Sequence, residues 1–389
     1  MKKSGIGNSK PLLITLLTLS ALLALAGVSI MTDFGQTFKI SKDIVVFFFK
    51  YNRWIIGLSF ISLITAAYIN YNIKFIKTKL MIVLASLWLL AILGMKYITP
   101  YLLFPTQQYN AEFVEIDAVD DKYLSEDEAV FVIDLNGVQK AYPRKNLWQA
   151  HVVGSDFGGQ EVLLTYCVFT NLPSPYINEP GENEMEFKVL AQTNNNLLLW
   201  DINSGEIIQQ INSTCEFSKN RLEPIPVMEM TWRGFEKLYP NGSVYYNPLS
   251  KPIERIISLL FNPEEAWYGE DWMFKTSNFD DKRFPSKEHL IGISNNDSQL
   301  AISKELIINS GKLNVEVGDK KMAVVYFPEY ETIGAFNRAL NDSIISVDTI
   351  DVFGNTPNGQ LKREFIFNSV LWSVWVYYYP NTEILKNEK

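Results

Sequence analysis

The sequence predicts N-terminal transmembrane α-helices followed by a mainly β (α+β) globular part that is built from two duplicated lobes. Three observations predict this fold class. Long apolar stretches lie within residues 1–99, short strand-like runs separated by Asn-Gly, Gly-Gly and Pro fill the remainder, and that remainder aligns with itself. Of the 389 residues, 47% are hydrophobic and 20% are charged, which excludes a wholly disordered chain.

Residues 1–99 form the expected membrane domain, with predicted transmembrane helices at 12–30, 54–71 and 80–98. At about 1.5 Å per residue, each stretch is long enough to cross the hydrocarbon core of a bilayer. No charge lies near the middle of a stretch, which favours a plain anchor over an ion or substrate path. A cleaved signal peptide is the alternative for the first stretch, but its apolar run exceeds a typical signal core and further spans follow.

The distribution of basic residues places the large C-terminal part outside the cytoplasm. Three spans put the chain ends on opposite sides, and the N-terminal tail with the second loop holds six Lys, against five basic residues on the other side. Residues 99–121, which follow the last span, contain acids but no Lys or Arg. The sequence therefore predicts an integral protein of the plasma or inner membrane, with the lipid bilayer as a partner.

Charge and residue counts exclude several classes of function. Residues 1–99 carry eleven Lys and Arg against two acids, and because the whole chain has a formal charge of -8, the remainder carries about -17, which argues against a nucleic-acid partner. Two His and two Cys are too few for the usual zinc sites, so no metal is expected. The sequence lacks a phosphate-binding Gly-rich loop, and no cofactor is predicted.

The globular part is divided by its internal similarity. After an acidic linker at 100–127, a first lobe covers 128–250, a connecting segment covers 251–283, and a second lobe covers 284–385. Residues 128–166 align without gaps to 288–326, and the Trp232 to Asn241 motif recurs as Trp372 to Asn381. The connecting segment has an apolar stripe that predicts a short amphipathic helix, formed by Ile253, Ile256, Ile257 and Leu260.

The residues whose side chains could take part in catalysis lie in the first lobe, because the second lobe has Phe327 in place of Cys167 and Gly311 in place of His151. If Gly158-Gly159 forms a two-residue turn, His151 faces Tyr166 across the hairpin; a three-residue loop places it opposite Cys167 instead. A nearby His can lower a thiol pKa and stabilise the nucleophilic thiolate. The alternative is that Cys167 is a small buried hydrophobe and that His151 is a structural hydrogen-bond donor.

Several short motifs follow one another in a fixed order: Asn136-Gly137, Ala141-Tyr142-Pro143, Trp148 and His151 ahead of Gly158-Gly159, Leu-Leu-Thr-Tyr-Cys at 163–167, Trp200-Asp201, Ser204-Gly205, Thr231-Trp232 and Tyr239-Pro240. Over roughly residues 112–385 the chain resembles the domain of unknown function family three-one-seven-nine, a membrane-anchored family with some selenoprotein members. The resemblance implies thiol or selenol redox chemistry at Cys167, with His151, Tyr166 and Thr170 around it. The family usually reads Thr-Tyr-Cys-Pro-Leu-Cys here, so Thr170 makes a degenerate Cys-x-x-Thr that cannot close a local disulfide.

Two functional hypotheses follow. The first is a thiol-redox or thiol-dependent enzyme that acts on a small-molecule or protein thiol partner, with a Cys167 pKa below its ordinary value. In that hypothesis Cys215 is either a distant resolving cysteine or a lone cysteine in a loop. The second hypothesis is a non-catalytic, membrane-tethered binding or scaffold protein, in which the two lobes form a cleft and the old site has decayed.

Overall fold

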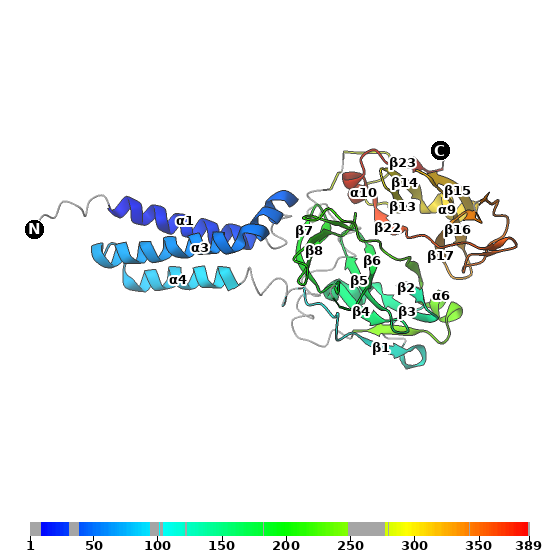
Figure 1. The fold of residues 1–389 in the computed structure, drawn as a ribbon, viewed down its shortest axis with the longest axis horizontal. Helices are drawn as coiled ribbons and strands as arrows, with labels where there is room; N and C mark the ends of the chain where they lie inside the picture. The colour runs from blue at the N-terminus through cyan, green and yellow to red at the C-terminus, as the bar shows by residue number, and fades with distance from the viewer. Residues whose placement is uncertain are drawn as a thin grey trace, which may run out of the picture. The chain divides into compact units, whose positions relative to one another are not determined.

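The structure is a computed structural model of the 389-residue chain. It describes residues 9–30, 39–93, 101, 104–120, 123–181, 183–247, 277–278, 280–341 and 343–387. The chain divides into two compact units, Met1–Phe104 with Val189–Asn194, and Pro105–Lys188 with Asn195–Lys389. Figure 1 shows long helices in the first unit and small sheets in the second, so the predicted order of N-terminal apolar helices followed by a mainly β globular part is confirmed.

The N-terminal unit contains the helices α1 (Ser9–Ile30), α3 (Lys42–Ile73) and α4 (Thr78–Leu93). α1 and α3 are long and apolar enough to cross a membrane, whereas the apolar stretch of α4 is shorter. These helices contain the first two predicted spans, and residues 94–98 of the third lie outside the described residues.

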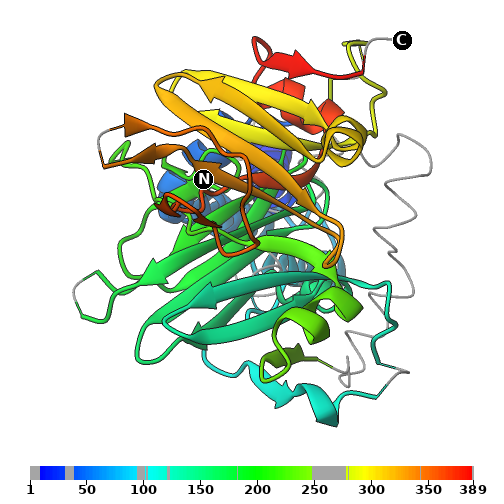
Figure 2. The same ribbon diagram turned by 90° about the vertical axis from the view of Figure 1, so that its right-hand side faces the viewer.

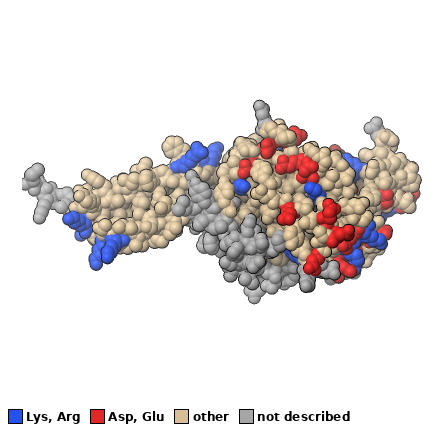
Figure 3. All heavy atoms as spheres, turned by 90° about the horizontal axis from the view of Figure 1, so that it is seen from below, with Lys and Arg blue, Asp and Glu red and all other residues tan. Residues whose placement is uncertain are grey.

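α3 begins earlier than the predicted second span because its helix continues through a charged first part that contains Lys50 and Arg53. The uncharged part from Trp54 to Ile73 is about 30 Å long at the usual rise per residue. Trp54 and Tyr71, near its two ends, are 79% and 78% exposed, as expected for aromatic side chains at a membrane interface. Figure 3 shows Lys and Arg gathered at the two ends of the helical unit, with uncharged surface between them, a distribution that supports membrane anchoring.

Two serines join the helices of this unit. Ser20 and Ser59 each donate a hydroxyl hydrogen bond to the other's carbonyl oxygen at 2.8 Å, and Trp88 Nε1 donates to Ser59 Oγ at 2.5 Å. Small hydroxyl residues permit close approach of helices and satisfy polar groups where no water is present. Lys10, near the start of α1, lies 5.0 Å from the Phe75 ring just beyond α3, so the two helices run antiparallel.

The first lobe of the globular unit is built on a five-stranded sheet. Its order is β1 (Glu112–Glu115), β12 (Ser243–Tyr246), β3 (Val138–Pro143), β2 (Ala129–Leu135) and β11 (Met228–Thr231), with β12 parallel to β3 and the other neighbours antiparallel. A three-stranded antiparallel sheet follows, made of β4 (Val152–Asp156), β5 (Glu161–Cys167) and β6 (Leu172–Asn178). The apolar core of the larger sheet includes Val130, Val132, Met230, Trp232 and Phe235.

Shorter elements complete this lobe: η2 (Ile116–Ala118), η3 (Arg144–Asn146), α5 (Leu147–Ala150), β7 (Phe187–Thr193), β8 (Asn196–Asp201), β9 (Ile207–Gln209), β10 (Thr214–Cys215) and α6 (Trp232–Leu238). β8 pairs with β9, and β9 pairs with β10, in antiparallel fashion.

Part of the segment predicted as a linker, 100–127, belongs to the globular unit instead. β1 is an edge strand paired with β12, and Gln107 bridges to Val153 of β4. At Gly154 the added Cβ of any other residue would lie 2.0 Å from the Gln108 carbonyl oxygen, so glycine is required for this close approach. The acids of β1 point to solvent from a sheet edge, which is why the segment resembles a solvated linker in sequence.

The second lobe repeats this plan (Figure 2). Its four-stranded sheet has the order β22 (Phe367–Leu371), β13 (His289–Asn295), β14 (Ser298–Ser303) and β23 (Glu383–Leu385), and its three-stranded sheet contains β15 (Lys312–Val317), β16 (Lys320–Phe327) and β17 (Thr332–Asn337). The remaining elements are α9 (Lys304–Ser310), β18 (Ala339–Leu340), β19 (Ser343–Ile344), β20 (Asn355–Thr356), β21 (Gly359–Gln360) and α10 (Trp372–Tyr378).

The two lobes share strand order and register. Val132 pairs with Ala141 and Gly292 with Ala301, positions that correspond at an offset of 160 residues. The strands β23 and β14 are parallel, as β12 and β3 are, and α6 and α10 both begin at the corresponding tryptophans, Trp232 and Trp372. These are the relationships that a duplication predicts, and the ancestral duplication itself stays a prediction.

The lobes contact each other through edge strands. β11 of the first lobe contacts β17 of the second, and β22 of the second contacts β6 of the first. Thr332 Oγ1 donates to the Glu229 carbonyl oxygen at 2.8 Å, and Asn368 Nδ2 donates to the Val227 carbonyl oxygen at 3.0 Å. An edge strand of the larger sheet in each lobe therefore contacts an edge strand of the smaller sheet in the other lobe.

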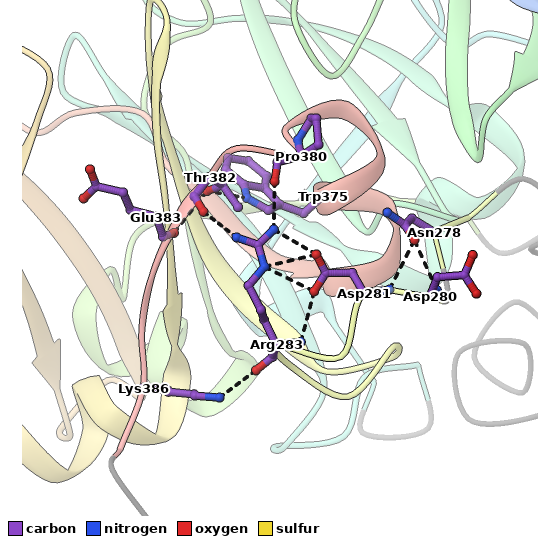
Figure 4. A network of polar contacts seen from close by, with 9 residues as sticks. All are labelled: Asn278, Asp280, Asp281, Arg283, Trp375, Pro380, Thr382, Glu383 and Lys386. Atoms are coloured by element: carbon purple, nitrogen blue, oxygen red, sulfur yellow. Dashed lines mark hydrogen bonds and ion pairs between the residues drawn. The ribbon is translucent and has the colours of Figure 1, made fainter.

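One arginine ties the end of the connecting segment to the C-terminal strand. The guanidinium of Arg283 forms an ion pair with Asp281 at 2.9 Å and donates to the carbonyl oxygens of Thr382 and Pro380, both at 2.8 Å (Figure 4). All three nitrogens of this guanidinium thus contact acceptors of the protein. The helix predicted around Ile253 to Leu260 lies outside the described residues.

Candidate functional site

The thiol site lies where the three-stranded sheet of the first lobe ends. Gly158 and Gly159, with φ of 65° and 90°, form a two-residue turn between β4 and β5. Val152 consequently pairs with Thr165, which is the register that places His151 opposite Tyr166 rather than opposite Cys167. Cys167 is the last residue of β5, and a tight connection follows it to β6.

His151 is held in place by the backbone. It adopts a left-handed conformation with φ of 46° after α5, where the second lobe has Gly311, and its Nδ1 lies 3.0 Å from the Tyr166 carbonyl oxygen. Burial lowers the pKa of His151 to about 4, although its hydrogen bond to Tyr166 acts in the opposite direction. At neutral pH the ring is uncharged, so it supplies no positive charge to stabilise a thiolate.

Cys167 is fully buried, with an exposed fraction of 0%. Burial raises the pKa of its thiol, and this effect outweighs the hydrogen bond from Thr170, which lowers it. The predicted lowering of the Cys167 pKa is therefore wrong for this conformation, because the sequence pattern cannot show the desolvation of the sulfur. Neither Cys167 nor Cys215 is in a disulfide, and Cys215 lies on β10 with an exposed fraction of 6%.

Of the four predicted site residues, the structure brings Cys167 and Thr170 together. The Thr170 hydroxyl lies 3.2 Å from Cys167 Sγ and 2.7 Å from the Asn195 carbonyl oxygen. Tyr166 precedes Cys167 on the strand, so its side chain lies on the opposite face of the sheet, where its hydroxyl donates to Asn171 Oδ1 at 2.8 Å. Tyr166 and His151 thus have structural partners that differ from those of the thiol.

A buried network of uncharged polar groups surrounds Thr170. Asn196 Nδ2 donates to Thr170 Oγ1 at 3.0 Å and to Gln210 Oε1 at 3.1 Å, and Gln210 Nε2 donates to Thr165 Oγ1 at 2.9 Å. Each of these side chains has an exposed fraction of 0%. Sequence reasoning missed Asn196, which reaches Thr170 from β8, and Gln210, which follows β9 and bonds Asn196 and Thr165.

The second lobe has an apolar core at the corresponding place. Thr165 corresponds to Val325 and Cys167 to Phe327, and these two residues pack with Phe336 and with other buried apolar side chains. A buried polar network is costly unless every group is hydrogen-bonded, and such networks restrict a core to one arrangement. The first lobe therefore has a polar interior at a place where the second lobe has an apolar core.

A cleft of about 510 Å³ lies between the two lobes, and sequence reasoning did not identify its residues. The first lobe lines it with Asp134, Leu135, Met228 and Tyr239, and the second with Val352, Phe353, Lys362 and Arg363, among others. This volume is within the range of about 300 to 1,000 Å³ that is usual for small-molecule sites. The only signal in the sequence was the recurring Tyr-Pro-Asn motif that begins at Tyr239, which also fits a role in the fold.

Charged groups from both lobes meet in this cleft. Tyr239 donates its hydroxyl hydrogen to Asp134 Oδ2 at 2.9 Å. Arg363 lies over the Phe336 ring, 4.7 Å from its centre, and donates Nη2 to the Val352 carbonyl oxygen. Burial lowers the pKa of Arg363 to about 10, whereas Tyr239 and Asp134 act to raise it, so the guanidinium remains charged at neutral pH.

A separate charged cluster lies at the junction of the lobes. Glu229 of β11 accepts hydrogen bonds from Ser369 Oγ at 2.7 Å and lies 3.6 Å from Lys304 Nζ. Although burial raises the pKa of Glu229, Lys304 and Arg144 hold it below its ordinary value. Within the described part of the chain, no cluster of three or more His, Cys, Asp or Glu is arranged to hold a metal ion.

The part of the chain that resembles known proteins begins where the globular unit begins, at residue 105. No curated protein and no solved structure matches the chain. A family model described as "protein of unknown function (DUF3179)" matches residues 105–385, which is more than half of the sequence and includes both lobes. The predicted resemblance is confirmed, and the chain belongs to this family of proteins of unknown function.

Proposed function

We propose that this chain is a membrane-anchored, extracytoplasmic binding protein whose ligand occupies the cleft between the two lobes. The observation that carries the proposal is the cleft itself, which combines a ligand-sized volume with apolar walls and a charged guanidinium. The closed surroundings of Cys167 support binding over catalysis, because a buried thiol with a raised pKa is a poor nucleophile.

Ligand-detected NMR on the full chain in lipid nanodiscs tests this function. The probes are a fragment set with equal numbers of carboxylates, amines and neutral aromatic compounds. We expect some fragments to bind the native chain and to lose binding in Leu135→Trp, which fills the cleft from a partly exposed position. Ile344→Trp, at a 48% exposed position outside the lining, is the matched control. If no fragment shows binding that depends on Leu135, the proposed function is wrong.

A thiol-dependent enzyme is the second candidate, and one observation favours it. The polar network around Cys167 and Thr170 exists in the first lobe, whereas Val325 and Phe327 make the equivalent region apolar in the second. An enzyme of this kind has to open the site before the thiol reacts with a thiol partner of small-molecule or protein origin.

Alkylation separates the two candidates. In a Cys215→Ser background, iodoacetamide reports on Cys167 alone, and the binding function predicts labelling only after denaturant is added. Rapid labelling of the native chain near neutral pH, slowed by His151→Ala, would favour the enzyme instead.

The extracytoplasmic location has its own test. The basic residues of the N-terminal tail and of the second predicted loop favour a cytoplasmic location for these two segments, which puts the globular unit on the other side. Protease added to spheroplasts is therefore expected to remove the globular unit. Digestion that requires lysis would place this unit in the cytoplasm.

A further inference from the structure

We propose that the ligand of the interlobe cleft is a carboxylate with a single negative charge on an apolar or aromatic body, and that Arg363 binds the carboxylate. This inference rests on the proposed binding function and adds the chemical class of the ligand.

Arg363 has unused donors, and Arg283, at the end of the connecting segment, shows the contrast. A guanidinium has five N–H donors in a planar fork. In Arg283 all three nitrogens donate to the protein, to Asp281, Thr382 and Pro380 (Figure 4). Within the described residues, Arg363 has one hydrogen bond, from Nη2 to the Val352 carbonyl oxygen, and it lines the cleft. Its other donors are available to a ligand there.

The position of this guanidinium is fixed by its surroundings. The Phe336 ring supports one face, and Gly334 leaves the space that the group needs, since a Cβ at that position would lie 2.6 Å from Nη1. A fixed, partly desolvated guanidinium forms stronger hydrogen bonds to an anion than a solvated side chain does.

The charges around the cleft favour a single negative charge over a dianion. Lys362 and Arg363 supply two positive charges from the second lobe, and Asp134 supplies one negative charge from the first. The lining therefore has a net charge of about one positive unit, which a monoanion neutralises. A phosphate dianion would leave an excess of negative charge next to Asp134.

The apolar residues of the cleft lining favour an apolar or aromatic body on the ligand. Met228, Val352 and Leu361 are buried apolar side chains with exposed fractions of 2 to 4%. Phe353 is 44% exposed and meets the Tyr239 ring edge-to-face, with 6.1 Å between the ring centres. An exposed aromatic ring beside an apolar wall offers a surface for a second aromatic or aliphatic group. The same chemistry is present in a free carboxylic acid and in the C-terminal residue of a peptide.

Titration calorimetry on the full chain in nanodiscs tests the ligand class. The first pair of probes is 3-phenylpropionate and 3-phenylpropanamide, and the second is a short peptide that ends in Phe with a free carboxylate and its amidated form. We expect each acid to bind at least about tenfold more tightly than its amide, because the amide cannot form charge-assisted hydrogen bonds. The pair with the higher affinity distinguishes a free acid from a chain end.

Variants test the role of the charges. Lys362→Gln and Arg363→Gln are expected to weaken acid binding, and Lys237→Gln, which removes an equal charge on a surface outside the cleft, is the control. Asp134→Asn should strengthen acid binding by about threefold, since it removes a repulsive charge. A gain of affinity cannot result from misfolding, so this variant keeps the test decisive even if Arg363→Gln is unstable.

The outcomes separate this inference from the proposed function. Equal affinities for acid and amide, or no change in Asp134→Asn and Lys362→Gln, would overturn the carboxylate inference. If only neutral or cationic fragments occupy the cleft, the inference fails while the binding function stands. If no fragment binds in a manner that depends on Leu135, both fail.

Discussion

The hydroxyl of Thr170 lies 3.2 Å from the sulfur of Cys167, at the end of strand β5. Thr170 occupies the position where the family resemblance leads us to expect a second cysteine. Its hydroxyl also reaches the Asn195 carbonyl oxygen at 2.7 Å and accepts from Asn196 at 3.0 Å. A threonine thus joins the thiol to a buried hydrogen-bond network, where a second cysteine would have offered redox chemistry.

Replacing Thr170 with valine should destabilise the globular unit. The substitution keeps the shape of the side chain but leaves the amide of Asn196 without one of its acceptors in a fully buried place. We expect a loss of about 1 to 3 kcal/mol in the free energy of unfolding, measured by urea titration with tryptophan fluorescence. Thr170→Ser retains the hydroxyl and should recover most of the loss. Equal destabilisation by valine and serine would mean that packing of the methyl group matters more than the network.

Restoring the second cysteine should restore a disulfide. The Thr170 oxygen is already within hydrogen-bonding distance of Cys167 Sγ, so a longer sulfur side chain at this position can reach it. In a Cys215→Ser background, we expect Thr170→Cys to lose the mass of two hydrogens after oxidation with diamide and to regain it with dithiothreitol. The same background with Thr170→Ser is the control. A chain that stays reduced after prolonged oxidation would show that the backbone here cannot meet disulfide geometry.

The stability of the fold should fall as the pH falls from about 6.5 toward 4. Burial lowers the pKa of His151 from its ordinary 6.5 to about 4, so the unfolded chain binds more protons in that window. The stabilising effect is complete above pH 6.5 and is lost as the solution acidifies, with a total of about 3 kcal/mol. His151→Asn, which tolerates the left-handed backbone, should flatten this part of the pH profile of the unfolding midpoint. Parallel profiles for the two proteins would contradict the assignment to His151.

Local pattern was enough to predict much of the fold. The Asn136-Gly137 and Gly158-Gly159 turns are positions with φ above zero, which Asn and Gly adopt at low cost, and both hairpins form there. The gapless offset between the lobes predicted a shared register because a one-residue slip would move every side chain to the other face. The apolar helices were predictable from length, although helix α3 also includes a charged stretch that contains Lys50 and Arg53.

Tertiary contacts explain what the sequence could not show. Thr170 contacts Asn196 of β8, and Asn196 in turn contacts Gln210 just after β9; no local spacing relates these residues. The cleft likewise joins Asp134 of one lobe to Arg363 of the other. Even the reactivity predicted for Cys167 depended on burial, which is a property of the whole lobe and not of its neighbours in the chain.

The charged cluster at the lobe junction gives a last prediction, on the stability of the two-lobe unit. Glu229, whose side chain is 14% exposed, lies beside Lys304 and Ser369 of the other lobe. Glu229→Gln leaves Lys304, which is 29% exposed, without its counter-charge and should cost about 1 to 3 kcal/mol of unfolding free energy in urea titrations.

The matched control is Glu329→Gln, which removes one partner of the Lys237–Glu329 pair, 2.9 Å apart and 55% exposed on both sides. An exposed pair of this kind contributes under about 1 kcal/mol. Adding Lys304→Met to Glu229→Gln removes the unpaired cation, so the double variant should recover part of the loss. If Glu229→Gln costs no more than Glu329→Gln, the Glu229 carboxylate has no role in joining the lobes.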